Sequence, residues 1–342
     1  MNILITIQAV DLDDPLNGFF HEWLKEASHH FDAITVLALR VGRHDLPKNI
    51  TIIPMRKAGS RSKLEAFWTL VRTSWQRRKM YDGVFVRTDA IYVLLCGWLW
   101  RLLAKPVVFW YAHYKPNKLL PFAEQIATVV VTSVPEAYPG RAMMAERLGQ
   151  GIDESRFLVH EKTEHAMLRL LVLGRVQRIK GVKEIVSEFI REGAYGGKAQ
   201  LTIVGPALDR DYEKEIEDLC VGRKDIRWIK GLSYDEIPSL LAEQDVLVNA
   251  YSGSLDKVIV ESMMMGMIPV VATRGLCHTV PLEWRWMVAE TPEERIRAIR
   301  KILSLASEER TRYAKRVREL AIRDHSMRGQ IERLANLFTR YE

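Results

Sequence analysis

The sequence has little cysteine and no long uninterrupted apolar run. Its three cysteines, Cys96, Cys220 and Cys277, are scattered over 342 residues and form no CxxC pair. This pattern argues against a disulfide framework or a zinc-type cluster and predicts a reducing compartment. The phosphate-binding pattern GxxxxGK[ST] is absent, and so are internal repeats and low-complexity tracts.

The most apolar stretch, residues 91–112, is interrupted by Arg101, Lys105 and Pro106. Because a membrane-spanning helix needs about 20 uninterrupted apolar residues, this stretch predicts a helix followed by a buried strand. The opening residues MNILITIQAV lack a basic segment and predict a first strand rather than a secretory signal. We therefore expect a cytoplasmic protein, with peripheral attachment to the inner face of the membrane as the alternative.

Apolar residues make up 48% of the chain and charged residues 27%, which is typical of a globular protein, and the length suits two domains. The net charge is +7, but the segment from Arg56 to Lys118 has 13 Lys and Arg against three acidic residues. Such a patch suits nucleic acid, an anionic membrane or a phosphorylated ligand, and a merely solvated surface is the alternative. No recognisable nucleic-acid module accompanies it, so we expect no nucleic-acid partner.

Short β-branched runs alternate with amphipathic helical stretches, a pattern typical of parallel sheets covered by helices on both faces. The predicted strands are 3–8, 33–39, 50–53, 83–87, 107–110 and 128–132, then 168–173, 200–204, 226–229, 246–249 and 268–272. We expect a helical segment after each strand. The polar stretch 159–165 separates the two series. The predicted fold class is α/β, with two Rossmann-like doubly wound domains, residues 1–165 and 166–325, facing a central cleft.

The stretch LGRVQRIKG, residues 173–181, follows an apolar strand and leads into a helix. Gly174 lets the chain leave the sheet sharply, which brings Arg175 and Lys180 to the carboxyl end of the strand. A planar guanidinium and a mobile ammonium beside a helix N-terminus suit a diphosphate. A solvated basic turn is the alternative interpretation of this motif taken alone.

A second informative stretch is SGSLDKVIVESMMMGMIPVVA, residues 252–272. We expect a helix to start near Asp256 and to end at Gly266, before the next strand. Glu261 lies within this helix among apolar residues, where a carboxylate needs partners. The vicinal hydroxyls of a ribose would serve, as they do for the acidic residue of dinucleotide sites. A salt bridge to a nearby Lys or Arg is the alternative.

Together these motifs resemble those of retaining glycosyltransferases of family four, which have the GT-B fold. The resemblance rests on GR-x4-KG at residues 174–181, followed about 80 residues later by the acidic helix and by GMIPVVA. Further similar stretches are DPxxGFFHxW at 14–23, WYAH at 110–113, GQGID at 149–153, VGP at 204–206 and KGL at 230–232. The match covers almost the whole chain.

The resemblance implies a role for each matching residue. Arg175 and Lys180 would bind the donor diphosphate and stabilise the leaving nucleotide, and His113 would reach the transferred sugar. Glu261 would hold the ribose. The rest of the donor site would comprise Gly18, Gly174, Gly205, Gly231, Leu232, Ser254, Leu255, Asp256 and Lys257. The resemblance also implies an N-terminal acceptor domain, a C-terminal donor domain, and a last helix, residues 326–342, that packs back on the first domain.

The implied activity is retaining, metal-independent transfer of a sugar from a UDP- or GDP-linked donor to a glycan or lipid-linked acceptor, in cell-surface polysaccharide or glycolipid synthesis. No cofactor beyond the nucleotide sugar is implied. The sequence departs from the family at Gly253, where the first of two glutamates eight positions apart is usual; Asp256 or Lys257 could replace its sugar contact. A nucleotide-sugar epimerase of the same fold and a catalytically silent nucleotide- or glycan-binding member remain alternative hypotheses.

Two weaker patterns complete the analysis. Asp11, Asp13 and Asp14 form an acidic cluster, for which a helix-capping turn is favoured over a metal site. An apolar stripe at helical spacing consists of Leu64, Phe67, Trp68, Val71 and Trp75. We expect this stripe to face the core; a helix lying in a membrane interface is the alternative.

Overall fold

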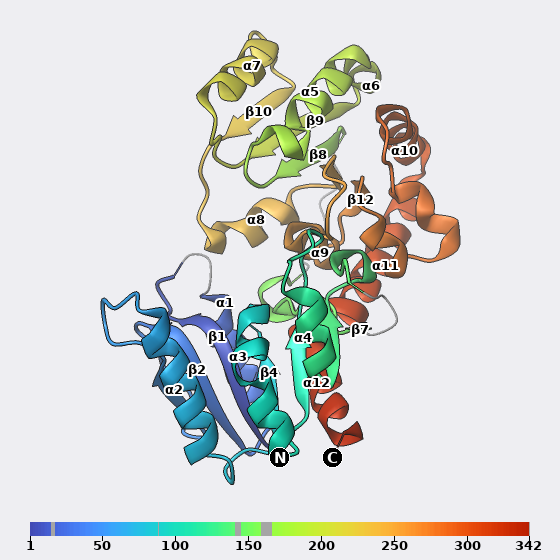
Figure 1. Cartoon of the computed structure of the whole chain (residues 1–342). Coiled ribbons are helices and arrows are strands. Elements are labelled where there is room, and N and C mark those ends of the chain that lie inside the picture. The colour runs from blue at the N-terminus through green and yellow to red at the C-terminus, as the bar shows by residue number, and fades with distance from the viewer. Residues whose placement is uncertain (15–17, 88, 141–144, 159–165, 342) are drawn as a thin grey trace. The chain divides into compact units, whose positions relative to one another are not determined.

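The computed structural model describes residues 1–14, 18–87, 89–140, 145–158 and 166–341 (Figure 1). By its internal contacts the chain divides into two compact units, Met1–Asp153 with His325–Glu342, and Glu154–Asp324. The domain boundary was expected after residue 165, and residues 159–165 lie outside the described residues. The division by internal contacts lies earlier, after Asp153. Arg318 explains part of this, because its Nη1 donates to the carbonyl of Phe157 at 2.7 Å and ties that segment to the second unit.

The first unit is built on one parallel sheet. Its strands are β1 (Asn2–Val10), β2 (Ala33–Val41), β3 (Ile50–Pro54), β4 (Gly83–Val86), β5 (Val107–Trp110), β6 (Val129–Thr132) and β7 (Ala145–Arg147). Their order in the sheet is β3-β2-β1-β4-β5-β6-β7, and every neighbouring pair is parallel. The first six follow the Rossmann order, whose switch point lies between β1 and β4.

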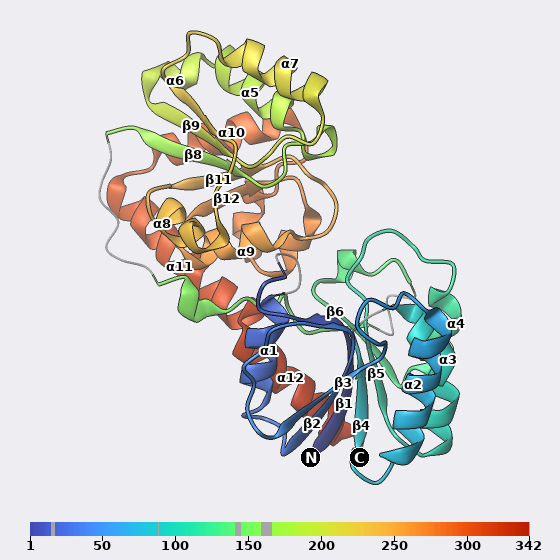
Figure 2. The ribbon, with the colours of Figure 1, turned by 90° about the vertical axis from the view of Figure 1, so that its left-hand side faces the viewer.

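Helices cover both faces of this sheet, as Figure 2 shows. One face carries α1 (Phe19–Ala27) and α12 (Met327–Arg340); the other carries α2 (Lys63–Gln76), α3 (Ala90–Leu102) and α4 (Leu120–Ile126). Side chains alternate along a strand, so Ile3, Ile5 and Ile7 pack under α1 and α12 while Leu4 packs under α2–α4. The last helix is therefore part of the first unit's core.

The second unit has a five-stranded parallel sheet, in the order β10-β9-β8-β11-β12. Its strands are β8 (Leu168–Leu173), β9 (Ala199–Val204), β10 (Ile226–Ile229), β11 (Val246–Asn249) and β12 (Ile268–Val271). Its helices are α5 (Val182–Arg191), α6 (Gly193–Gly197), α7 (Arg210–Cys220), α8 (Ile237–Ala242), α9 (Lys257–Met264), α10 (Pro292–Ser304) and α11 (Ser307–His325), the last of which reaches the first unit at His325. Short 3-10 turns η4 (Arg178–Lys180) and η5 (Tyr234–Glu236) follow β8 and β10.

The α/β class with two Rossmann-like sheets is confirmed, and each of the predicted strands exists within a residue or two of its expected bounds. The expectation of a helix after every strand is wrong for β2, because residues 42–49 form an irregular connection to β3. Strand β7 was not predicted, since its three half-buried residues, AER, carry no alternating apolar signal.

The expectation that the apolar stripe of α2 faces the core is wrong for three of its five members. Leu64, Trp68 and Trp75 are 72%, 64% and 49% exposed. The core side of α2 consists of Ala66, Leu70, Thr73 and Ser74. Among them, Ser74 is small enough to contact two large neighbours. The Trp100 indole donates to Ser74 Oγ at 3.0 Å, and the Tyr81 hydroxyl donates to the Ser74 carbonyl at 2.9 Å.

Among the described residues, no helix combines the length and the apolar character that crossing a bilayer requires.

Candidate active site

The predicted donor-site residues of the second unit gather at one edge of its sheet. Gly174 follows β8 and Gly205 follows β9, while Gly231 and Leu232 follow β10. The loop of residues 254–257 leads from β11 into α9. Because the strands are parallel, their carboxyl ends meet at the same edge, where ligands of open α/β sheets bind.

Two glycines make this edge sharp. Gly174 and Gly205 have φ values of +130° and +136°, which side-chain-bearing residues rarely adopt. A Cβ on Gly205 would lie 2.0 Å from the carbonyl oxygen of Gly174, so the two backbones touch. The Gly174 N–H also donates to the Val204 carbonyl at 2.9 Å. The β8 and β9 loops therefore leave the sheet as one closely packed pair.

A cavity of about 210 Å³ opens beside these loops. It is lined by Val172, Leu173, Gly174, Arg175, Lys180, Val182, Asn249, Asp256, Lys257 and Val258. Five of the predicted donor-site residues thus share one cavity, with three cations against one carboxylate. Another cavity, of about 180 Å³, lies at the opposite, amino-terminal edge of the sheet near Leu168 and Val246, and it contains none of the predicted residues.

The cations at the cavity differ in their surroundings. Lys180 Nζ lies 2.5 Å from Asp256 Oδ2 and 3.7 Å from the centroid of the Tyr251 ring. Arg175 is exposed and pairs with no carboxylate of the described residues. Gly181, at φ +63°, turns the chain into α5, whose N-terminus has no side-chain cap. The Lys183 N–H of the first turn donates to the Tyr212 hydroxyl at 3.0 Å, and the positive end of the helix dipole lies at the cavity, which suits an anion.

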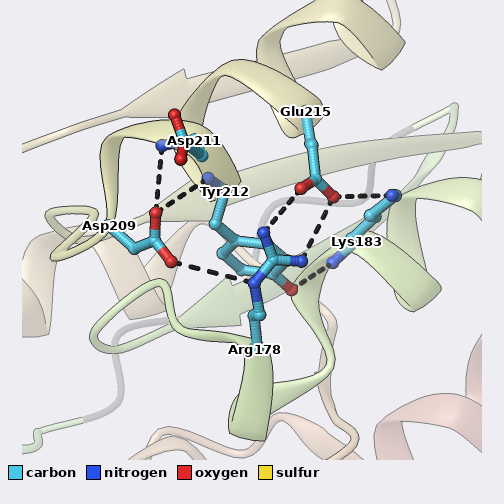
Figure 3. Close-up of polar contacts among 6 residues, drawn as sticks. All are labelled: Arg178, Lys183, Asp209, Asp211, Tyr212 and Glu215. Carbon is cyan, nitrogen blue, oxygen red and sulfur yellow. Dashed lines mark hydrogen bonds and ion pairs between the residues drawn. The ribbon is translucent and has the colours of Figure 1, made fainter.

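The remaining cation of the motif, Arg178, belongs to a structural cluster beside the cavity (Figure 3). Arg178 Nη2 and Lys183 Nζ each lie 2.6 Å from a carboxylate oxygen of Glu215, on α7. Hydrogen bonds from both cations hold the pKa of Glu215 down to about 2. The Arg178 guanidinium also lies 4.8 Å from the Tyr212 ring centroid, and the Tyr212 hydroxyl accepts the Lys183 N–H at 3.0 Å. This cluster fixes the η4 turn that carries Lys180.

Glu261 is 6% exposed within α9. The Tyr234 hydroxyl donates to Glu261 Oε1 at 3.1 Å, and the Arg156 guanidinium lies 4.7 Å from the Tyr234 ring centroid. Burial raises the pKa of Glu261, partly opposed by Lys257, Tyr234 and Arg156. In the part of the chain that the structure describes, Glu261 forms no salt bridge, which leaves the expected ion-pair alternative without support.

The loop before α9 explains the departure at Gly253. A Cβ at Gly253 would lie 2.2 Å from the Tyr251 ring, so this ring occupies the space of a side chain at position 253. The Thr273 hydroxyl donates to the Gly253 carbonyl at 2.7 Å and holds the loop. Leu255 is 1% exposed, which leaves only its backbone for ligand contact. Ser254 is half-buried.

Two predicted residues, His113 and Gly18, belong to the first unit. His113 is exposed after β5; its Nδ1 accepts the Lys115 N–H at 3.2 Å, which leaves Nε2 to carry the proton of the neutral ring. Gly18 precedes α1, with its N–H donated to the Asp14 carbonyl at 2.8 Å. A Cβ on Gly18 would lie 2.9 Å from that carbonyl oxygen, so its small size serves the loop itself.

The expected capping role of the acidic cluster is wrong. Gly18 is the N-cap of α1, and no side chain caps this helix. Asp14 instead pairs with Arg40 at 2.6 Å and Asp13 with Arg43 at 2.7 Å. Asp11 Oδ1 accepts the Asp13 N–H at 3.1 Å, a local turn.

Sequence reasoning missed Arg87, which follows β4 and is 7% exposed. Its guanidinium lies within 4.8 to 5.7 Å of four ring centroids, those of Phe19, Phe20, Trp23 and Trp110. Burial lowers its pKa to about 9. It makes one long hydrogen bond, to Gln330 Oε1 at 3.4 Å. No sequence signal marked Arg87, Tyr234 or Arg156; Tyr251 lay beside a motif that could have drawn attention to it.

Comparison with known proteins gives a family and a fold. Residues 168–305 match the family described as glycosyl transferases group 1. No curated protein matches the chain. The chain is similar to Anabaena Alr3699/HepE in complex with UDP, at 15% identity over 99% of this chain and 100% of that one, with a TM-score of 0.73.

Two further solved structures are similar over nearly their whole length. Sucrose-phosphate synthase from Thermosynechococcus elongatus is 15% identical over 99% of this chain and 98% of that one, with a TM-score of 0.69. WaaG, a glycosyltransferase involved in lipopolysaccharide biosynthesis, is 15% identical over 98% and 99%, with a TM-score of 0.63. At 15% identity the structural similarity establishes the fold alone. The chain therefore has the GT-B fold, and its residues 168–305 match the family of group 1 glycosyltransferases.

Proposed function

We propose that the protein transfers a sugar, with retention of configuration, from a UDP- or GDP-linked donor to a glycan or lipid-linked acceptor in polysaccharide or glycolipid synthesis. The observation that carries the proposal is the cavity of about 210 Å³ lined by Arg175, Lys180 and Lys257 against the single carboxylate of Asp256. A diphosphate complements this excess of positive charge. Two similar HepE structures are complexes with UDP and with UDP-glucose, which supports a uridine nucleotide as the first donor to test.

The diphosphate would meet Arg175 and Lys180 beside the N-terminus of α5, whose helix dipole favours an anion. Arg175 is exposed, and its planar guanidinium suits two phosphate oxygens. Lys180 would exchange part of its contact with Asp256 for a phosphate oxygen. Asp256 or Lys257 would then bind a sugar hydroxyl in place of the side chain that Gly253 lacks.

The nucleoside would lie along the adjacent loops. Among the described residues, the Glu261 carboxylate accepts one side-chain hydrogen bond, from Tyr234, and its remaining acceptor sites suit the two hydroxyls of a ribose. The backbone at Gly205, Gly231 and Leu232 would contact the base. Ser254 and the backbone of Leu255 would complete the donor site.

The chemistry follows from charge stabilisation. The bond between the anomeric carbon and the diphosphate oxygen breaks as the acceptor oxygen bonds to the same face of that carbon. The acceptor proton passes to the departing phosphate oxygen. Arg175 and Lys180 neutralise the charge that develops on this oxygen, which is worth roughly 3–4 kcal/mol per donor group. His113, with its proton on Nε2, would hydrogen-bond the transferred sugar, and Gly18 would let the first loop approach it.

We place this reaction in the cytoplasm, on the inner face of the membrane when the acceptor is a lipid. The free thiols of Cys96, Cys220 and Cys277 suit a reducing compartment. Neither a cofactor nor a metal enters the proposed mechanism.

Calorimetric titration of the protein with UDP, GDP, ADP and CMP tests the donor site. We expect one nucleoside diphosphate to bind, and Arg175→Ala to weaken that binding while the protein stays folded. The lack of binding by every nucleotide would contradict the proposal. A matched control is Arg191→Ala, which removes an exposed cation at the far end of α5.

A catalytically silent nucleotide-binding protein is the second candidate, favoured by the Tyr251 ring in the space of a side chain at 253. Release of nucleotide from radiolabelled UDP-sugars in the presence of lipid-linked acceptors separates the two candidates. Nucleotide binding without any turnover would favour the silent one.

A further inference from the structure

The outer surface of α2, α3 and α4 carries an unusual set of exposed apolar side chains. We call it the α2–α4 face; its members are Leu64, Trp68, Trp75, Trp98, Leu102 and Phe122. Their exposed fractions are 72%, 64%, 49%, 54%, 73% and 59%. The three helices lie next to one another on one side of the first sheet (Figure 2), opposite α1 and α12. Large exposed apolar side chains gathered on neighbouring helices indicate an interaction site, whereas single ones scattered over a surface need no explanation.

The composition of α3 is unusual for a helix with an exposed side. Its sequence, AIYVLLCGWLWRL, is apolar almost all round, which is typical of a helix buried on every side. Yet only its inner side is covered, by the sheet and by its two neighbours. Leu94 and Leu95 are half-buried and pack against the core of the first unit, whereas Trp98 and Leu102 are exposed. The Trp98 indole N–H already donates to the Leu95 carbonyl at 2.9 Å. Removing water from the ring therefore leaves no unpaired indole donor.

Cations surround these apolar side chains. Lys63, Arg72 and Lys79 are exposed on or just after α2, and Arg101 and Lys118 are exposed near α3 and α4. Arg78 lies 4.5 Å from the Trp75 ring centroid, an arrangement common where an aromatic ring meets a charged interface. The Arg101 guanidinium donates to the Gln125 carbonyl at 2.9 Å and joins α3 to α4.

Three of the acidic residues of this region accept hydrogen bonds from neighbouring residues, whereas Asp89 is exposed beside the start of α3. Glu65 accepts hydrogen bonds from the Ser60 hydroxyl at 2.6 Å and the Lys57 N–H at 2.9 Å. Asp82 accepts the Asn2 N–H at 2.7 Å. Glu124 is 5% exposed and bonds the Tyr138 hydroxyl. The face therefore presents indoles and leucines within a field of positive charge.

We propose that the α2–α4 face docks on an anionic lipid bilayer, with the indoles in the interface and the cations on the headgroups. Trp, Leu and Phe on one surface, with Lys and Arg around them, are what an interfacial protein needs. Charge complementarity selects this occupant: a second copy would bring the same excess of cations against the first and would be repelled. Docking goes beyond the proposed reaction, since it requires no donor, and it gives a lipid-linked acceptor a route to the enzyme.

Vesicle sedimentation tests the proposal with the full chain. We expect the protein to sediment with vesicles of phosphatidylglycerol and phosphatidylcholine at 0.1 M salt, and to stay in solution with phosphatidylcholine alone. Raising the salt to 1 M shortens the Debye length from about 10 Å to about 3 Å and should release most of the protein.

Two pairs of double variants separate this face from general surface effects. Trp68→Ser with Trp98→Ser should weaken vesicle binding at least about tenfold. Its control, Leu208→Ser with Leu282→Ser, removes two apolar side chains that are exposed on the second unit. Arg72→Gln with Lys79→Gln should weaken binding about fivefold per cation. Its control, Arg312→Gln with Lys315→Gln, removes the same charge from α11.

Several results would overturn the proposal. One is a wild-type protein that ignores anionic vesicles at 0.1 M salt; another is an equal loss of binding in the control variants. A dimer in sedimentation equilibrium that Trp68→Ser with Trp98→Ser dissociates would assign the face to a second copy instead. Calorimetric nucleotide affinity should be the same in all four variants, so failure of docking and failure of the proposed transfer are read separately.

Discussion

Lys180 and Asp256 form an ion pair of 2.5 Å at the cavity, although they are 76 residues apart in the chain. The pair joins the turn after β8 to the N-cap of α9 after β11, and the Lys180 ammonium lies 3.7 Å from the Tyr251 ring centroid. Asp256 therefore holds Lys180 at the cavity before a donor arrives. Under the proposed function, an entering diphosphate would compete with Asp256 for the same ammonium.

The first prediction concerns the diphosphate cations. Arg175→Ala and Lys180→Ala should each lower turnover by about 10²-fold or more, because each removes charge stabilisation of the leaving group. The melting temperature should change little. Steady-state kinetics with the donor identified by calorimetry would measure this, and unchanged nucleotide affinity and turnover in both variants would refute the assignment.

The second prediction concerns Asp256. Asp256→Asn should raise the affinity for the free nucleoside diphosphate by about fivefold, because it removes a competing charge worth about 1 kcal/mol in water-like surroundings. If Asp256 also binds a sugar hydroxyl, the variant should lose the extra affinity of the nucleotide sugar over the nucleotide. Calorimetry with both ligands checks the two effects together. A lower affinity for the nucleotide itself would speak against competition.

The third prediction concerns the buried carboxyl of Glu261. Burial raises its pKa above the ordinary 4.5, so the folded state binds this proton more tightly than the unfolded state does. The wild type should lose stability as the pH rises from 4.5 through the raised pKa, and Glu261→Gln should not show that loss. At neutral pH the variant should bind nucleotide weakly. Melting curves across pH, with and without nucleotide, test both points; intact nucleotide affinity would remove the ribose role.

The fourth prediction concerns Glu215, whose pKa is lowered to about 2 by Arg178 and Lys183. Its stabilising contribution is complete above the ordinary value of 4.5 and is lost as the pH falls toward 2. Glu215→Gln should therefore be less stable than the wild type at pH 7, with the gap closing in acid. Urea unfolding at several pH values measures it. A gap independent of pH would show that the charges of this cluster do not matter.

The fifth prediction compares two glycines at the same edge of the sheet. Gly205→Ala places a Cβ 2.0 Å from the Gly174 carbonyl oxygen at φ +136°, and should destabilise the second unit by about 2 kcal/mol or more. Gly231→Ala meets open space and should leave the melting temperature unchanged. If Gly231 contacts the base, its variant should change nucleotide affinity alone. Equal destabilisation by both variants would contradict the backbone argument.

Much of the fold was predictable because it is encoded locally. The apolar runs of β1 and β8 and the alternation of Ile3, Leu4 and Ile5 identify strands covered on both faces. The Gly-Arg and Lys-Gly pairs of residues 174–181 identify a sharp turn from strand to helix, with cations at a known edge of the sheet. Parallel strands then bring the loops after β8, β9, β10 and β11 together without further information.

The sequence by itself determined the strands other than β7, the motif, and the edge of the second sheet at which the predicted donor-site residues gather. Only the tertiary structure decided which side of α2 is buried, since a stripe of Leu64, Trp68 and Trp75 looks the same whether it meets a core or solvent. Helical periodicity reports that a helix has two sides, and the neighbouring elements decide which is covered. Likewise the Lys180–Asp256 pair, the four rings around Arg87 and the Tyr251 ring beside Gly253 depend on the packing of side chains in space. Such contacts arise from the folded chain as a whole, because no local pattern sets the distance between residues that lie far apart in sequence or on opposite sides of a loop.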